Sequence, residues 1–174
     1  PQIFPMEVFE EGAEIILSIS RLFANVHGAR YKIAFCDALT TLVLQVAHRG
    51  SVELHHPTWV EVTDSLWPKV QAMCTKPRYW AASLGLGTAV LCASREDAFL
   101  QHWWNFLESS SQNIKDRSKR KSLLEAACQL LWSYLFRCKE SSNATSKRLD
   151  AFLHLWFPSQ RRTYDLSDGG VELA

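Results

Sequence analysis

Apolar residues recur along most of the chain at the three- and four-residue spacing of amphipathic helices. Prolines, glycines and capping residues divide this pattern into separate segments. The pattern predicts seven helices, which lie at roughly residues 6–26, 29–48, 57–74, 77–91, 94–113, 116–138 and 144–157. We therefore expect an all-α chain.

Several of the helix starts carry a local signal. Pro57 and Pro77 suit the first turn of a helix, where a proline loses no hydrogen bond. Ser94 resembles the start of a capping box, with Asp97 as its partner. Asp116 is expected to cap the sixth helix, and Asn143 is expected to help cap the seventh. Close helix packing is the expected reason for Gly85 and Gly87 in the fourth helix, because each costs about 1 kcal/mol there relative to alanine.

The helices pair in chain order, and the seventh opens a further pair. The second members of the pairs begin near residues 29, 77 and 116, a period of roughly 40 to 48 residues. This period predicts an α-solenoid of HEAT- or armadillo-like antiparallel helix pairs, with the second, fourth and sixth helices in one layer. A compact all-α bundle is the structural alternative. Residues 1–158 would form the helical-repeat domain, and residues 159–174 a polar tail.

The stretch from Leu123 to Pro158 is the most informative, because large apolar residues surround one polar hinge, KESSNATSKR. It predicts two stacked helices. Trp132 and Phe136 lie four residues apart, which is a core spacing. If the Trp132 ring is fully buried, its replacement by alanine should cost about 3 to 5 kcal/mol.

Composition changes this picture little. The chain has 174 residues, of which 47% are hydrophobic, enough for one cooperative core or one block of repeats. Eighteen acidic residues oppose nineteen basic ones, so general affinity for nucleic acid is not expected. No apolar run reaches the roughly 18 residues of a membrane span, and no signal peptide is visible. The start at Pro1 suggests a fragment of a longer protein.

Catalytic and metal-binding patterns are absent from the sequence. The five cysteines are odd in number, widely spaced and without a C-x-x-C motif, which favours reduced, packed thiols in a cytosolic protein. The six histidines are scattered or adjacent and form neither H-x-x-x-H nor H-E-x-x-H. Gly85-Leu86-Gly87 lacks the third glycine and preceding strand of a nucleotide-binding turn. We therefore expect no enzyme activity, no metal and no cofactor.

Several segments together resemble the N-terminal region of the Furry family, the large cell-morphogenesis proteins of fungi and animals. The order and spacing of these segments carry the resemblance, rather than any single motif. They span about residues 20 to 158 and include His27-Gly28, Ala34-Phe35-Cys36-Asp37-Ala38-Leu39, His56-Pro57, Lys76-Pro77-Arg78, Lys115-Asp116-Arg117, Leu131-Trp132 and Tyr134-Leu135-Phe136-Arg137-Cys138.

The resemblance implies a helical-repeat scaffold that acts with NDR-type kinases and their Mob co-activators in cell morphogenesis and polarised growth. It implies no catalytic residue. A cytoplasmic protein is expected, located at the cell cortex or at sites of polarised growth, with protein partners and neighbouring repeats of the same long chain. The alternative is a helical-repeat adaptor for the cytoskeleton or for membrane trafficking, unrelated to kinase signalling.

Basic residues recur at the starts of alternate predicted helices. Cations there oppose the helix dipole by roughly 0.3 to 1 kcal/mol each, so their placement needs a reason. In a solenoid these starts would stack along one edge and, with free backbone N–H groups, form a strip that binds anions. An acidic or phosphorylated peptide is the natural ligand, and anionic lipid or RNA are the alternatives; a plain solvated charge run is the simpler interpretation. The strip would consist of Arg30, Lys32, Arg78, Arg117, Lys119, Arg120 and Lys121.

Adjacent tryptophans, Trp103 and Trp104, lie in the fifth predicted helix. They cannot both point into one seam between helices. The simpler interpretation buries both between adjacent helix layers. The alternative makes one of them an aromatic anchor for a partner, because tryptophan is enriched at binding hot spots.

Overall fold

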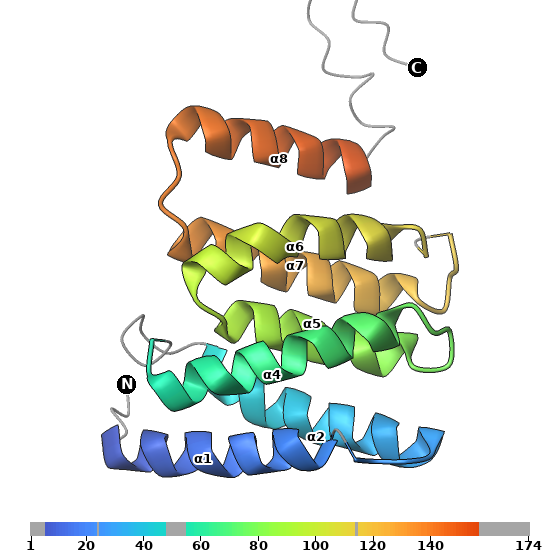
Figure 1. Ribbon diagram of the computed structural model, residues 1–174. Coiled ribbons are helices and arrows are strands. Elements are labelled where there is room, and N and C mark those ends of the chain that lie inside the picture. The colour runs from blue at the N-terminus through green and yellow to red at the C-terminus, as the bar shows by residue number, and fades with distance from the viewer. Residues whose placement is uncertain (1–5, 24, 48–54, 114, 157–174) are drawn as a thin grey trace, which may run out of the picture. The chain divides into compact units, whose positions relative to one another are not determined.

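The computed structural model describes residues 6–23, 25–47, 55–113 and 115–156, and these form seven α-helices without any β-strand (Figure 1). This confirms the all-helical prediction for the described part of the chain. The predicted polar tail at 159–174 lies outside the described residues. The helices are α1 (Met6–Phe23), α2 (Ala29–Ala47), α4 (Pro57–Cys74), α5 (Trp80–Ala93), α6 (Glu96–Ser111), α7 (Arg120–Arg137) and α8 (Ser142–Trp156).

Two compact units divide the chain, Pro1–Cys138 and Lys139–Ala174. The second contains α8, where the backbone N–H of Ala144 donates to Oγ of Ser141 over 3.3 Å. Ser141 therefore caps this helix, and the prediction of Asn143 as the cap was wrong by two residues. Arg148 holds the segment before the helix by donating from Nε and Nη2 to the Glu140 carboxylate, at 2.7 and 2.9 Å.

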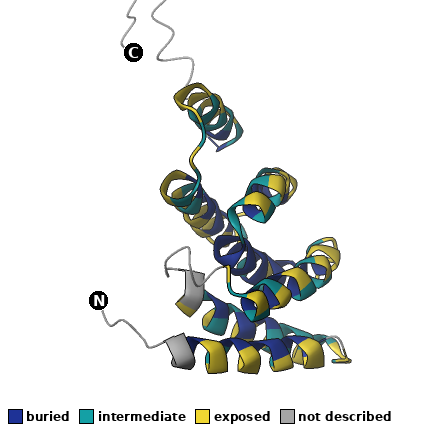
Figure 2. Ribbon diagram, turned by 60° about the vertical axis from the view of Figure 1, so that its left-hand side comes forward, coloured by how far each residue is buried: buried dark blue, intermediate teal, exposed yellow. Residues whose placement is uncertain are grey.

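In the first unit, α5 is the central helix, and it packs against α2, α4, α6 and α7 (Figures 1 and 2). The helices α2, α5 and α7, which are the second members of the predicted pairs, lie side by side in this order. The helix α1 packs on α2 and α4, and α6 packs on α7 and α5. Successive helices run in opposite directions, so α2, α5 and α7 all begin at the same edge (Figure 1).

The sequence of α5 explains its central place. It carries apolar or small residues on every side, and most of its fourteen residues are buried. A helix that is apolar all round is stable only when neighbours surround it. Close approach of α6 requires Gly87, because a Cβ atom there would lie 2.6 Å from the Phe106 ring and 3.0 Å from Val70. Gly85 has ordinary space around it, 3.9 Å from Thr40, so the packing explanation holds for Gly87 alone.

Side chains from two of its neighbours, α4 and α7, hold the C-terminal end of α5. Nε1 of Trp59 in α4 donates to the carbonyl oxygen of Ala93 over 2.8 Å. The Arg137 guanidinium at the end of α7 donates to the carbonyl oxygens of Cys92 and Ser94 and lies 5.4 Å from the centre of the Phe99 ring. The last carbonyl groups of a helix have no partner within it, and a cation there also suits the helix dipole. We call these contacts the α5 clamp.

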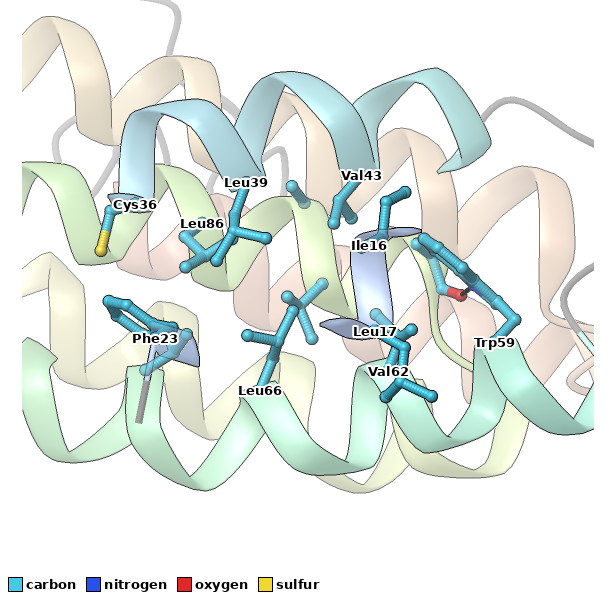
Figure 3. Close-up of a cluster of buried hydrophobic side chains, with 14 of the residues drawn as sticks. Ile16, Leu17, Phe23, Cys36, Leu39, Val43, Trp59, Val62, Leu66 and Leu86 are labelled. Atoms are coloured by element: carbon cyan, nitrogen blue, oxygen red, sulfur yellow. Dashed lines mark hydrogen bonds between the residues drawn. The ribbon is translucent and has the colours of Figure 1, made fainter. Parts of the chain in front are cut away.

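The core between α1, α2, α4 and α5 is apolar (Figure 3). Burial raises the pKa of the Cys36 thiol to about 12 and that of the Cys92 thiol to about 11, so both stay protonated at neutral pH. Cys128 is exposed, unlike the packed cysteines that the sequence predicts. The core residues labelled in Figure 3 are Ile16, Leu17, Phe23, Cys36, Leu39, Val43, Trp59, Val62, Leu66 and Leu86.

Two predicted helix starts differ from the structure by three residues or more. The helices α5 and α7 begin at Trp80 and Arg120, three and four residues after the predicted Pro77 and Asp116. Asp116 instead orders the preceding turn, where it accepts hydrogen bonds from the backbone N–H and the hydroxyl of Ser118.

The capping box predicted at the start of α6 was also wrong. The Ser94 hydroxyl donates back to the carbonyl oxygen of Leu91 over 2.8 Å, so it closes the end of α5 rather than opening α6. The residue before the first turn of α6 is Arg95, which makes no side-chain capping bond.

We predict that Gly87→Ala is less stable than Gly85→Ala by about 1 to 3 kcal/mol, the usual cost of overpacking a core. Both substitutions gain about the same helix propensity, so their difference isolates the contact with Phe106 and Val70. Urea denaturation of the two variants measures it. Equal stability would mean that the Phe106 ring moves aside without cost.

Candidate partner-binding surfaces

The turns before α2, α5 and α7 lie together at one edge of the first unit, on the right of Figure 1. This edge gathers the seven basic residues of the predicted strip, and we call it the basic edge. Arg30 and Lys32 lie in the first turn of α2, and Arg78 lies in the turn before α5. Lys76, in the same turn, is exposed and belongs to this edge, although the prediction omitted it. The residues contributed by α7 and its preceding turn are Arg117, Lys119, Arg120 and Lys121.

Some of these cations already have partners within the chain. Nζ of Lys119 lies 3.3 Å from the Asp116 carboxylate and 5.2 Å from the centre of the Trp80 ring, so it ties the turn before α7 to the start of α5. Hydrogen bonds from Ser118 lower the pKa of Asp116, which keeps this carboxylate charged near neutral pH. Lys121 lies 3.8 Å from Glu125 on its own helix. These pairs reduce what Lys119 and Lys121 can offer to a partner.

Three arginines remain available to a partner, one near the start of each of α2, α5 and α7. Arg30, Arg78 and Arg117 are exposed, and none forms an ion pair with another residue in the described ranges. Arg78 lies over the ring of Tyr79, 5.6 Å from its centre. The structure therefore brings the predicted residues to a common edge, but it distinguishes free cations from paired ones, which the sequence pattern cannot do.

A groove between α4 and α6 is the second candidate surface, and sequence reasoning missed it. One cavity of about 460 Å³ lies between the C-terminal halves of these helices, above the start of α5. A smaller cavity of about 180 Å³ lies nearer the end of α5. Trp67 and His102 line both cavities, and their ring centres are 5.2 Å apart. We call the two cavities together the α4–α6 groove.

Trp103 is a core residue rather than a surface anchor. Its side chain is fully buried and stacks between Phe99 and Tyr134, with ring centres 5.7 and 5.0 Å away. Trp104 is half-buried and meets Trp103 edge to face at 5.6 Å. The structure thus separates the two adjacent tryptophans: only Trp104 reaches the surface.

The prediction that Trp132 and Phe136 lie in the core was wrong. Trp132 is 61% exposed and Phe136 is 76% exposed, and their rings contact each other at 4.8 Å. The four-residue spacing correctly places them on one helical face, but α7 buries the opposite face, which includes Leu130 and Tyr134. Exposed Leu135 continues the apolar surface, so α7 is apolar on both sides.

Within the described ranges, no group of three or more His, Cys, Asp and Glu side chains could hold a metal ion. No helix among the described residues is both long enough and apolar enough to cross a membrane. Three surfaces of the described residues stand out chemically: the basic edge, the groove and the exposed aromatic pair on α7.

Residues 2–173 match the family described as "Cell morphogenesis N-terminal". The chain is 30% identical over 161 residues to the cell morphogenesis protein PAG1 of Saccharomyces cerevisiae, covering 91% of this chain. It is 26% identical over 156 residues to the cell polarity protein mor2 of Schizosaccharomyces pombe, covering 90% of this chain. The chain spans about 7% of the length of each relative. No solved structure matches it.

We predict that two tryptophan replacements differ sharply in their effect on stability. Trp103→Ala should lower the free energy of unfolding by about 3 to 5 kcal/mol, because it empties a buried aromatic stack. Trp132→Ala should lower it by less than about 1 kcal/mol, because the ring is largely exposed. Chemical denaturation of both variants provides the comparison, and similar losses would contradict the placement of Trp132.

Proposed function

The chain belongs to the cell morphogenesis N-terminal family, as its resemblance to the Furry proteins predicts, and from this premise we propose that it is part of a non-enzymatic scaffold. The scaffold acts with NDR-type kinases and their Mob co-activators in cell morphogenesis and polarised growth. The names of the two yeast relatives support the morphogenesis and polarity part of this proposal. The kinase and Mob partners come from the family resemblance. The protein would act in the cytoplasm, at the cortex of growing regions.

The scaffold is an α-solenoid of HEAT- or armadillo-like helix pairs in this proposal. The side-by-side order of α2, α5 and α7 supports it, because each solenoid repeat packs only on its neighbours. The sequence of α7 supports it as well. In the first unit α5 has a neighbour on either side within this layer, whereas the exposed face of α7, with Trp132, Leu135 and Phe136, is still apolar. In a longer chain that face would receive the next helix of the layer.

The basic edge is the surface through which the scaffold holds a partner in this proposal. At one edge, the start of α2 and the turns before α5 and α7 each supply an exposed arginine, namely Arg30, Arg78 and Arg117. Free N–H groups and the positive end of the helix dipole both favour a negative ligand. The partner chemistry is therefore an acidic or phosphorylated protein segment. This common placement of three basic turns is the observation that carries the proposal.

We predict that the combined variant Arg30→Glu, Arg78→Glu, Arg117→Glu binds a purified NDR kinase–Mob complex at least about tenfold more weakly, a loss of about 1.4 kcal/mol. The reversed charges repel the acidic partner, while exposed charges without ion pairs contribute little to folding. Biolayer interferometry at roughly 50 and 200 mM salt measures the affinity, which should fall with salt for the unaltered chain because surface charges are screened.

The matched control replaces the same three arginines by lysine, which keeps the charge, and it should retain both affinity and salt dependence. Unchanged affinity in the glutamate variant would remove the basic edge from the proposal. If the unaltered chain does not bind the complex at all, the kinase–Mob part fails, and the adaptor for cytoskeleton or membrane trafficking becomes the better account.

A further inference from the structure

The α4–α6 groove follows the length of the central helix. The larger cavity lies over Trp80 at the start of α5, and the smaller one lies over Val90 and Leu91 near its end. Its α4 wall extends from Thr63 to Cys74, which corresponds to about 17 Å at 1.5 Å per residue. A fully extended polypeptide rises about 3.3 Å per residue, so about five residues span this length.

Unused hydrogen-bonding groups face the larger cavity from both walls. Gln71 lines it from α4 and Asn105 from α6, and neither side-chain amide makes a hydrogen bond with any residue that the structure describes. Trp67 lines both cavities, and its Nε1 is buried without a hydrogen-bond partner among the described residues. Each side-chain amide has an N–H donor and a carbonyl acceptor. A peptide backbone has the same two groups, so the amide and the backbone can hydrogen-bond to each other.

Opposite charges mark the two ends of the groove. Asp64 lines the smaller cavity; it is exposed and forms no ion pair with the residues described. Lys119 lines the larger cavity at the other end and already forms an ion pair with Asp116. A ligand that lies along the groove therefore meets a free carboxylate at one end and an ammonium group at the other.

The free amides discriminate between peptide conformations, because a helix satisfies its own backbone groups whereas an extended backbone can pair with Gln71 and Asn105. The Trp67 and His102 rings contact each other between the two cavities, with ring centres 5.2 Å apart, so a ligand lies over these rings and not between them. An extended backbone can lie over these rings and reach both cavities. Phe106 and Trp80 also line the larger cavity, where the small exposed parts of their rings give it an apolar wall.

We propose that the α4–α6 groove binds an extended protein segment of about five residues, which carries a basic side chain at the Asp64 end and an acidic one at the Lys119 end. Gln71 and Asn105 pair with its backbone. This inference does not depend on the kinase–Mob partners or on the basic edge, since it rests on different residues.

Selection from a displayed library of random twelve-residue peptides on the unaltered chain tests this inference. We expect enriched peptides with a basic and an acidic residue about four or five positions apart. Fluorescence polarisation of the best peptide should then give at least about tenfold weaker binding to the double variant Gln71→Leu, Asn105→Leu, because two backbone amide pairs are lost. Asp64→Asn should weaken it less and remove the preference for the basic residue.

Gln101→Leu is the matched control, since Gln101 is an exposed amide on α6 that does not line the groove. It should bind the peptide as the unaltered chain does, and circular dichroism should show all variants equally helical. Failure of any peptide to enrich would overturn the proposal. Equal binding to the double leucine variant would overturn it too, as would loss of binding only in the triple arginine reversal, which would move the peptide to the basic edge.

Discussion

The arrangement of the first unit depends on how the C-terminal end of α5 is held. Three of the last carbonyl groups of this helix and its cap face the interior and accept hydrogen bonds from Trp59 of α4 and Arg137 of α7. A buried carbonyl without a partner costs about 1 to 3 kcal/mol, so these donors offset a large part of the penalty for burying a helix end. Burial lowers the pKa of Arg137, yet a guanidinium stays charged near neutral pH and suits the negative end of the helix dipole. One helix end thereby fixes the positions of two neighbours.

Both candidate surfaces follow from this clamp. With α4 and α7 fixed to the same end of α5, and with helices alternating in direction, the turns before α5 and α7 meet at the opposite end, where Lys119 contacts Trp80. The outer side of those two turns forms most of the basic edge, and the start of α2 supplies the rest. The α4–α6 groove lies over α5 because α6 packs on α7 and α5, and meets α4 mainly through the Trp67 side chain.

Much of this fold could be predicted from periodicity, because a sequence with a strong apolar repeat has few ways to bury it. The seven helices of the described residues follow from local pattern, whereas the pattern could not tell crowded Gly87 from uncrowded Gly85. Helix starts were less predictable, because the side chains of Ser94 and Asp116 can hydrogen-bond either to the preceding segment or to the following one. Ser94 bonds back to Leu91, and Asp116 bonds to Ser118 in the turn before α7. Periodicity also could not say which apolar face of α7 is buried, because both faces have core spacing and only tertiary contacts choose between them. The groove was invisible to sequence reasoning, since Gln71 and Asn105 are ordinary surface residue types until two separate helices place them opposite each other.

Native-state hydrogen exchange, compared between the unaltered chain and Arg137→Gln, tests the role of the clamp most directly. In the unaltered chain, the amides of α5 and α7 should exchange only through global unfolding of the first unit. In the variant, the amides of α7 should exchange through a partial opening of lower free energy, while those of α1, α2 and α4 keep a common, higher value. Protection of α7 that falls no further than that of α1, α2 and α4 would contradict the account, because the clamp would then not be what joins α7 to the central helix.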